Sequence, residues 1–300
     1  MTPDGGLVRA TVRLDGPLNV ASSLEPFRRS GDDLLDRWDG TTLLRTLPTS
    51  MGTVPYRMRP EGTLDAPLLD VTVADPDHLP FVLEAIGSTF VTAPRALAAL
   101  AAADPVVARL DALYPGLRPV RQFDLFAAIV RCISAQQVNL TWAATLRRRL
   151  AEAFGRRHGI DGAEVWSLDT TTLADARVDD IRALQWTTRK AEYIVGVATA
   201  IAAGDLDPRR LRELPDDEVI ARLTRLRGLG VWTAEWVLAR SLGRPRVVAG
   251  DLGVRKAIGA AYLGDPLPSE ERVRAATAHW SEAAGVAQAL VLQGLVAGGL

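Results

Sequence analysis

A glycine-containing segment between two predicted helices offers backbone amides that could hold an anion. It runs Leu226-Arg-Gly-Leu-Gly-Val-Trp-Thr-Ala234, with Gly228 and Gly230 on either side of Leu229. Glycine at both positions permits a tight turn and close approach by another chain. The following helix begins with unpaired N–H groups, which suit a phosphate. A plain turn between helices is the alternative, but the full segment, Thr233 included, favours a hairpin that binds the DNA backbone irrespective of base sequence.

Asp251 is a candidate for a fixed negative charge. It lies 21 residues after Gly230, in the segment Val247-Val-Ala-Gly-Asp-Leu-Gly-Val-Arg-Lys256. An aspartate directly before a helix most often serves only as its N-cap. Here the preceding residues are apolar and Gly250 lets the chain turn sharply. We therefore expect a rigidly held carboxylate that both caps the helix and can act on a substrate.

The composition is that of an ordinary folded protein of 300 residues, with 48% hydrophobic and 24% charged residues. We find no stretch near the ~18 apolar residues that a membrane span needs, and no signal peptide at the start. A single cysteine, Cys132, excludes an intramolecular disulfide and metal sites built from several cysteines. The three histidines are isolated in the sequence. These features predict a cytoplasmic protein without a metal centre.

Charge is distributed unevenly along the chain. Residues 1–120 hold 11 Lys/Arg and 15 Asp/Glu, whereas residues 121–300 hold 24 and 21. The weak basic bias of the second part is compatible with a polyanionic partner and is not evidence for one by itself.

Turn and periodicity signals divide the chain into an α+β part and a helical part. Asp39-Gly40 predicts a tight hairpin between two alternating segments. From residue 94 onward, apolar residues at helical spacing predict helices throughout, with Asn139 as one N-cap. The predicted strands cover residues 7–14, 34–38, 41–47 and 68–73, and the predicted helices 78–89, 94–113, 124–137, 140–154, 188–203, 215–226, 231–242 and 252–262, with further helices starting at Thr170 and Ser269.

Several of these segments resemble the helix–hairpin–helix DNA glycosylases. The glycine hairpin followed by Asp251 is typical of that family, and Ile133-Ser-Ala-Gln-Gln-Val-Asn139 resembles its Gln-Gln-Val-Ser signature at a helix turn. Residues 102–117 and 188–193 are similar to stretches of 3-methyladenine DNA glycosylase II. The resemblance is strong over about residues 100–262 and weak towards both ends.

Together, pattern and resemblance imply a mixed, mainly α fold. A small N-terminal α+β domain with an antiparallel sheet would cover residues 1–92, followed by an all-α helix–hairpin–helix glycosylase core. Within that core, residues 121–243 would form the helical domain with the hairpin. Residues 93–120 and 244–300 would form a second helical domain that carries Asp251.

The resemblance makes Asp251 the catalytic carboxylate. Hydrolysis of an N-glycosidic bond passes through a cationic sugar, which a fixed carboxylate stabilises while it orients or deprotonates water. The base must leave the stack to be reached. The family fills the resulting hole with a side chain of the Gln-Gln-Val turn, here Gln137 with Gln136 beside it. A polar loop without this role is the equally weighted alternative for either glutamine.

Trp232 and Trp236 lie four residues apart and share one face of the helix after the hairpin. Aromatic faces stack on bases and attract cationic alkylated purines, although core packing is the commoner fate of a helical tryptophan. Stacking is favoured for Trp236, because the similar enzyme has an aromatic residue there, and both interpretations stay open for Trp232. Bifunctional members carry a nucleophilic lysine at the position of Trp232, which predicts a monofunctional hydrolase here. The other five tryptophans are predicted core residues.

Two departures from the similar enzyme predict a base pocket with fewer aromatic rings. Leu252 follows Asp251 where an aromatic residue is frequent, and no aromatic residue follows Trp280. Such a pocket favours cationic bases that leave easily, 3-methyladenine and 7-methylguanine, over hypoxanthine or ethenoadenine.

We therefore expect a monofunctional DNA glycosylase that removes alkylated purines from duplex DNA by base flipping, in base excision repair. The alternative is a non-catalytic protein of the same fold that binds damaged DNA. A transcription factor is disfavoured, because the helix after the hairpin is apolar and aromatic rather than rich in Arg, Asn or Gln. We expect a monomer at the nucleoid, with no membrane partner and no cofactor, although family members often hold a monovalent cation in the hairpin.

Overall fold

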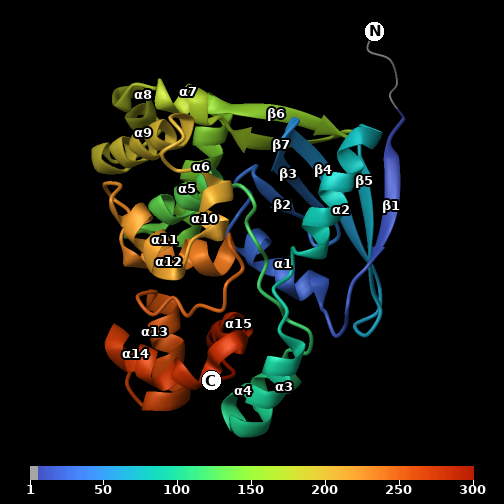
Figure 1. The fold of residues 1–300 in the computed structure, drawn as a ribbon, viewed down its shortest axis with the longest axis vertical. Helices are drawn as coiled ribbons and strands as arrows, with labels where there is room; N and C mark the ends of the chain where they lie inside the picture. Colours follow the sequence, from blue (N-terminus) through green and yellow to red (C-terminus); the bar gives the residue numbers. More distant parts are fainter. Residues whose placement is uncertain (1–5) are drawn as a thin grey trace.

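Alternating apolar residues near the N-terminus build an antiparallel sheet with one buried face. The computed structural model describes residues 6–300 and gives the strand order β1-β5-β4-β3-β2 (Figure 1). Val54, Tyr56 and Met58 of β4 are buried, and helices α1 and α2 contribute to the same core. The elements are β1 (Val8–Arg13), α1 (Val20–Arg29), β2 (Asp36–Trp38), β3 (Leu43–Thr49), β4 (Gly52–Gly62), β5 (Pro67–Val73) and α2 (Leu79–Gly87).

The predicted α+β character and the antiparallel sheet are confirmed. Gly40 has a φ of +103°, as the tight turn between β2 and β3 requires. In this N-terminal part, α1 and β4 are not among the predicted elements. Pro26 lies inside α1, while Pro55 and Pro60 lie inside β4. Proline weakens the sequence signal of both kinds of element.

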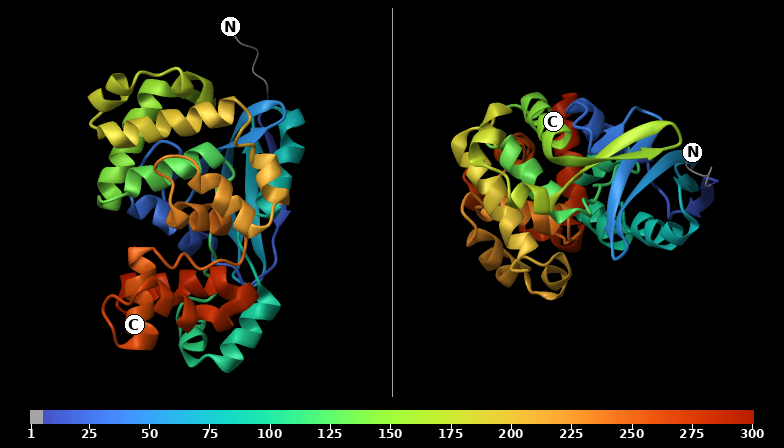
Figure 2. Two further views of the ribbon diagram at one scale, coloured as in Figure 1. Left: turned by 60° about the vertical axis from the view of Figure 1, so that its left-hand side comes forward. Right: turned by 90° about the horizontal axis from the view of Figure 1, so that it is seen from above.

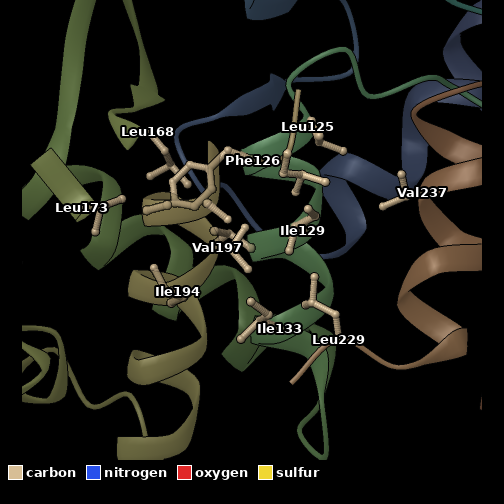
Figure 3. Close-up of a cluster of buried hydrophobic side chains, with 14 of the residues drawn as sticks. Leu125, Phe126, Ile129, Ile133, Leu168, Leu173, Ile194, Val197, Leu229 and Val237 are labelled. Carbon is tan, nitrogen blue, oxygen red and sulfur yellow. The ribbon is translucent and has the colours of Figure 1, made fainter. Parts of the chain in front are cut away.

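The helices around the predicted hairpin share one large core. Figure 3 shows side chains of this core, including Leu229 beside Ile133 and Val237 on the neighbouring helix. The helices are α5 (Leu125–Ala135), α6 (Leu140–Phe154), α7 (Thr170–Ala174), α8 (Val178–Ala183), α9 (Thr188–Ala202), α10 (Pro208–Glu213), α11 (Asp216–Thr224) and α12 (Val231–Arg240).

The expectation of helix throughout after residue 94 is wrong at one place. Strands β6 (Gly155–Ile160) and β7 (Ala163–Leu168) form an antiparallel hairpin after α6. Its two-residue turn is Asp161-Gly162, and both residues have a positive φ. This pair is itself a strong hairpin signal, but β6 (Gly-Arg-Arg-His-Gly-Ile) is polar, and in β7 Val165 and Trp166 are adjacent, so neither strand alternates clearly. The hairpin is fixed by contacts with the N-terminal part, such as the Trp166 N–H donating to the Leu34 carbonyl at 2.8 Å.

A second helical core joins segments that are far apart in the sequence. Helix α4 (Pro105–Leu113) packs against α15 (Ala284–Ala297), and α3 (Pro94–Ala103) packs against the turn at Ala278–Ala283 (Figures 1 and 2). Helices α13 (Leu252–Ile258) and α14 (Glu270–Thr277) complete the same core. The single helix predicted over 94–113 is wrong, because Pro105 keeps Asp104 in an extended conformation that ends α3 and caps α4. The helix predicted to reach Tyr262 ends at Ile258 and continues as a π-helical turn, Gly259–Leu263.

Buried ion pairs fasten the N-terminal part to the helices. Asp33 accepts from Arg147 at 2.7 Å and lies 3.0 Å from Arg131, which also binds Asp36 at 2.7 Å. Arg45 binds Asp36 at 2.5 Å. Burial raises the pKa of the Asp33 carboxyl, but the two guanidinium groups lower it more, to about 2. Within residues 6–300, none of the helices has the length and apolar character to cross a membrane.

Candidate functional site

The segment between α11 and α12 is a tight turn that requires glycine at position 228. Gly228 has a φ of +88°, and a Cβ there would lie 2.2 Å from the ring of Tyr193 on α9. The next residue, Leu229, is buried in the large helical core and so anchors the turn. The turn is closed by the Leu229 N–H, which donates to the Leu226 carbonyl at 3.1 Å. The predicted hairpin between two helices is therefore present.

Gly230, in contrast, is not required by the fold. Its backbone is extended, which any residue can adopt, and no heavy atom lies within 4 Å of a Cβ placed there. Gly230 is the N-cap of α12, and no side chain within residues 6–300 caps that helix. The first intrahelical bond runs from the Ala234 N–H to the Gly230 carbonyl. The start of α12 thus leaves N–H groups free beside open space, as a phosphate site needs.

Thr233 differs from the other hairpin residues assigned to DNA binding. Its side chain is 1% exposed, and its hydroxyl has no hydrogen-bond partner among the described residues. The residue lies in the first turn of α12, so its backbone N–H, rather than its side chain, is the group that can face an anion. Assignment of Thr233 to DNA binding stays a prediction that concerns the amide.

Asp251 is held by three hydrogen bonds. One carboxylate oxygen accepts from the Gly253 N–H at 2.8 Å and from the Val254 N–H at 3.1 Å. The other accepts from the indole N–H of Trp232 at 3.1 Å. The N-cap prediction is confirmed, and the rigid placement expected for a working carboxylate has a physical cause.

The chain before Asp251 is fixed as well. The Val248 N–H donates to the buried side chain of Gln288 on α15 at 2.7 Å, and the Asp251 N–H donates to the Val248 carbonyl at 3.0 Å. The carboxylate is therefore tied to α12 through Trp232 and to α15 through its own backbone.

The two tryptophans of α12 are half-buried, and Leu252 is exposed. Trp232 and Trp236 are both partly accessible, and the Leu252 side chain is 55% exposed at the start of α13. Trp232 donates to Asp251 and is only partly buried, so both base stacking and core packing stay open for it. The stacking role of Trp236 and the pocket role of Leu252 stay predictions.

The two glutamines after α5 have different environments. Gln136 is half-buried, and its side-chain amide donates to the Gly228 carbonyl at 3.1 Å, so the turn lies against the hairpin. Gln137 is exposed and has a φ of +58°. Gln136 therefore joins the two loops, and Gln137 is the more accessible of the two; entry of either into DNA stays a prediction.

Lys190 of α9, which the sequence did not single out, lies against the turn that carries Gln136 and Gln137. Its ammonium donates to the carbonyls of Ser134 and Gln136, at 2.9 and 2.7 Å, and is buried. Burial lowers the pKa of Lys190. Lys190 and Tyr193 belong to the segment 188–193 that resembles the family, so a signal existed. The spacing of residues in the sequence did not indicate that α9 contacts both loops, the glutamine turn through Lys190 and the hairpin through Tyr193.

His279, although isolated in the sequence, has partners in the structure. Its Nε2 lies 2.8 Å from the carboxylate of Asp104, which also accepts from the Tyr262 hydroxyl at 2.8 Å. Tyr262 and His279 each pack edge-on against buried Trp280. This cluster joins α4 to the C-terminal helices. Within the described part of the chain, no group of three or more His, Cys, Asp or Glu side chains could hold a metal ion.

Comparison with known proteins agrees with this geometry. Residues 130–283 match the HhH-GPD superfamily of base excision DNA repair proteins, and the chain belongs to that family. It is 29% identical to a DNA-3-methyladenine glycosylase of Bacillus subtilis over 185 residues, which are 61% of this chain and 61% of that relative. The chain thus matches about three fifths of that relative's length.

Two solved structures share the whole fold. A 3-methyladenine DNA glycosylase from Archaeoglobus fulgidus has a TM-score of 0.84 at 22% identity, covering 95% of this chain and 98% of that one. An 8-oxoguanine glycosylase/lyase from Clostridium acetobutylicum, solved with duplex DNA, has a TM-score of 0.75 at 15% identity, covering 98% and 99%. Because these two proteins are named for different activities and share this fold, the fold alone does not determine the substrate.

Proposed function

We propose that this protein is a monofunctional DNA glycosylase that removes alkylated purines from duplex DNA in base excision repair. The observation that carries the proposal is the triply hydrogen-bonded Asp251, which accepts from Trp232 in the first turn of the helix that begins, uncapped, at the hairpin. The Bacillus relative is named for 3-methyladenine, which supports the substrate class. The partner is double-stranded DNA that contains such a base, bound by one copy of the chain.

Binding begins at the DNA backbone. The turn at Gly228–Gly230 and the uncapped start of α12 offer N–H groups to a phosphate without reading the base sequence. Gln137 then enters the duplex and occupies the place of the flipped nucleotide. Gln136 keeps this turn in register with the hairpin through its bond to Gly228.

Chemistry takes place at Asp251. As the bond between base and sugar breaks, the sugar becomes oxocarbenium-like, and the fixed carboxylate stabilises its positive charge. The same group orients or deprotonates the attacking water. No group has to reorient when charge develops, because the three donors already hold the carboxylate.

A lyase step through an amine is not part of the proposal. Trp232 stands at the lysine position of bifunctional members, and the Lys190 ammonium is engaged by two carbonyls. The expected product is an intact strand with an abasic site. Borohydride trapping should give no covalent adduct between enzyme and DNA, and a trapped adduct would contradict this part.

The proposed substrate range is narrow. Leu252 is exposed, and α15 carries no aromatic residue to close a pocket. Each missing base-stacking ring removes roughly 1–3 kcal/mol by analogy with single-strand binding. Single-turnover rates should be highest for 3-methyladenine and 7-methylguanine; comparable rates on hypoxanthine would refute the narrowing.

The deciding experiment measures abasic-site formation on methylated duplex DNA by alkaline strand cleavage. The wild-type protein should release base, and Asp251→Asn should release none while its affinity for DNA stays within about threefold. Base release by the variant at the wild-type rate would refute the role of Asp251. Binding without base release by the wild type would favour the alternative, a damaged-DNA-binding protein.

A further inference from the structure

Glu235 is a fully buried carboxylate on α12 that the proposed reaction does not use. Its side chain is 0% exposed and lies one position before Trp236. One oxygen accepts from Arg246 at 3.0 Å and from Arg274 at 2.6 Å. The second oxygen has no hydrogen-bond partner among the described residues. Burying a charged carboxylate with one unsatisfied oxygen costs free energy, and the bonds to the two arginines offset that cost.

The two arginines come from the parts of the chain that position Asp251. Arg246 lies in the segment between α12 and α13, five residues before Asp251. Arg274 lies on α14, one of the C-terminal helices. Both side chains are partly exposed, at 32% and 40%, while the carboxylate between them is not. Glu235 therefore joins three segments at one buried point.

Trp232 and Glu235 lie three positions apart on α12 and so occupy neighbouring places on one side of the helix. Trp232 bonds directly to Asp251, and Glu235 bonds to the segment that leads to Asp251. These two connections run in parallel from the helix that offers its amides to DNA. They set where the carboxylate stands relative to that helix.

We propose that Glu235 is a positioning residue for Asp251. Through Arg246 and Arg274 it holds the linker and the C-terminal helices against α12, so that the carboxylate keeps its place beside Trp232. The inference rests on the proposed glycosylase function. Because a shift of about 1 Å at a reacting group can cost on the order of 100-fold in rate, loss of this connection should reduce the chemical step and not DNA binding.

The test compares Glu235→Gln and Arg246→Met with the control Arg272→Met. Glutamine keeps the shape of the side chain and removes its charge. Arg272 lies on the same helix as Arg274, but its ion pair with Asp265 is at the surface. Single-turnover base release and affinity for abasic duplex DNA are measured well below the melting temperature of each variant.

We expect base release to fall about 10- to 100-fold for both test variants, with affinity within about threefold and the control unchanged. Rates within twofold of wild type would overturn the proposal, as would an equal loss in the control or a loss confined to affinity. Arg246 is partly exposed, so its variant decides the matter if Glu235→Gln does not fold.

A second readout is independent of activity. The Trp232 indole N–H, assigned by its loss in Trp232→Phe, should shift in the NMR spectrum of both test variants because its bond to Asp251 changes. If the wild type releases no base, the proposed function fails, whereas an unshifted indole resonance overturns the positioning role alone.

Discussion

Replacing Trp232 with phenylalanine tests how the catalytic carboxylate is held. The change keeps an aromatic ring and removes the indole N–H that donates to Asp251 at 3.1 Å. The two backbone donors from α13 remain, so Asp251 still caps the helix and the loop stays in place. The perturbation is thus confined to one of three hydrogen bonds.

The expected magnitude follows from the nature of that bond. A hydrogen bond to a charged group contributes about 1.5–3 kcal/mol, and each 1.4 kcal/mol corresponds to about tenfold in rate. If the bond acts by keeping the carboxylate beside the sugar, single-turnover base release should fall roughly 10- to 100-fold. Affinity for DNA should change by less than about threefold, because the hairpin amides are untouched.

The assay is single-turnover release of methylated purine from duplex DNA, with Arg272→Met as the control, because the ion pair of Arg272 with Asp265 is at the surface. Asp251 accepts its side-chain hydrogen bond from Trp232. A rate for Trp232→Phe equal to that of wild type would mean that the backbone donors alone position the carboxylate. An increase in rate would mean that the indole weakens the carboxylate's charge, and the reasoning would be refuted.

Three further predictions concern the supports of the site. Gly230→Val should weaken DNA binding at least tenfold, because its side chain projects into the open space where a phosphate would lie. It should cost only about 1 kcal/mol of stability, as valine does at an N-cap, whereas Gly228→Val should unfold the turn against Tyr193. Salt-dependent affinity and thermal melting separate the two variants, and unchanged affinity of folded Gly230→Val would show that no phosphate approaches there. Lys190→Met should lower the extent of base flipping, because the Ser134 and Gln136 carbonyls lose their donor. Flipping is followed by the fluorescence of 2-aminopurine beside the lesion, and Lys190→Arg should recover part of the signal. Normal flipping in Lys190→Met would contradict the role of Lys190 in supporting the glutamine turn. The Asp33 pKa of about 2 lies below its ordinary value of 3.8, so the ionised carboxylate stabilises the fold above pH 4, and this stabilisation is lost as the pH falls towards 2. The free energy of unfolding in urea should drop by about 2 kcal/mol over that range. This pH-dependent drop should be absent in Asp33→Asn.

Local sequence signals were sufficient wherever a short segment determines its own conformation. Asp251 and Asn139 cap helices because an oxygen of a short side chain reaches the first free N–H groups of its own helix. Asp39-Gly40 forms the predicted turn because glycine takes a positive φ without strain. Gly228 takes a positive φ for the same reason, whereas Gly230 has an extended backbone; the spacing of the two glycines led to the prediction of the family.

Only the tertiary structure determined which of these residues contact one another. The bond between Trp232 and Asp251 crosses 19 residues, and that between Gln136 and Gly228 crosses 92. The partnership of Lys190 with the glutamine turn depends on how α9 packs, which no local pattern records. The strands β6 and β7 lack clear alternation, since β6 is polar and β7 has adjacent apolar residues, and they are held by contacts with the N-terminal part. The sequence therefore determined which residues could act, and packing between distant segments determined which of them meet, because hydrogen bonds over such separations form only after the cores have brought the helices together.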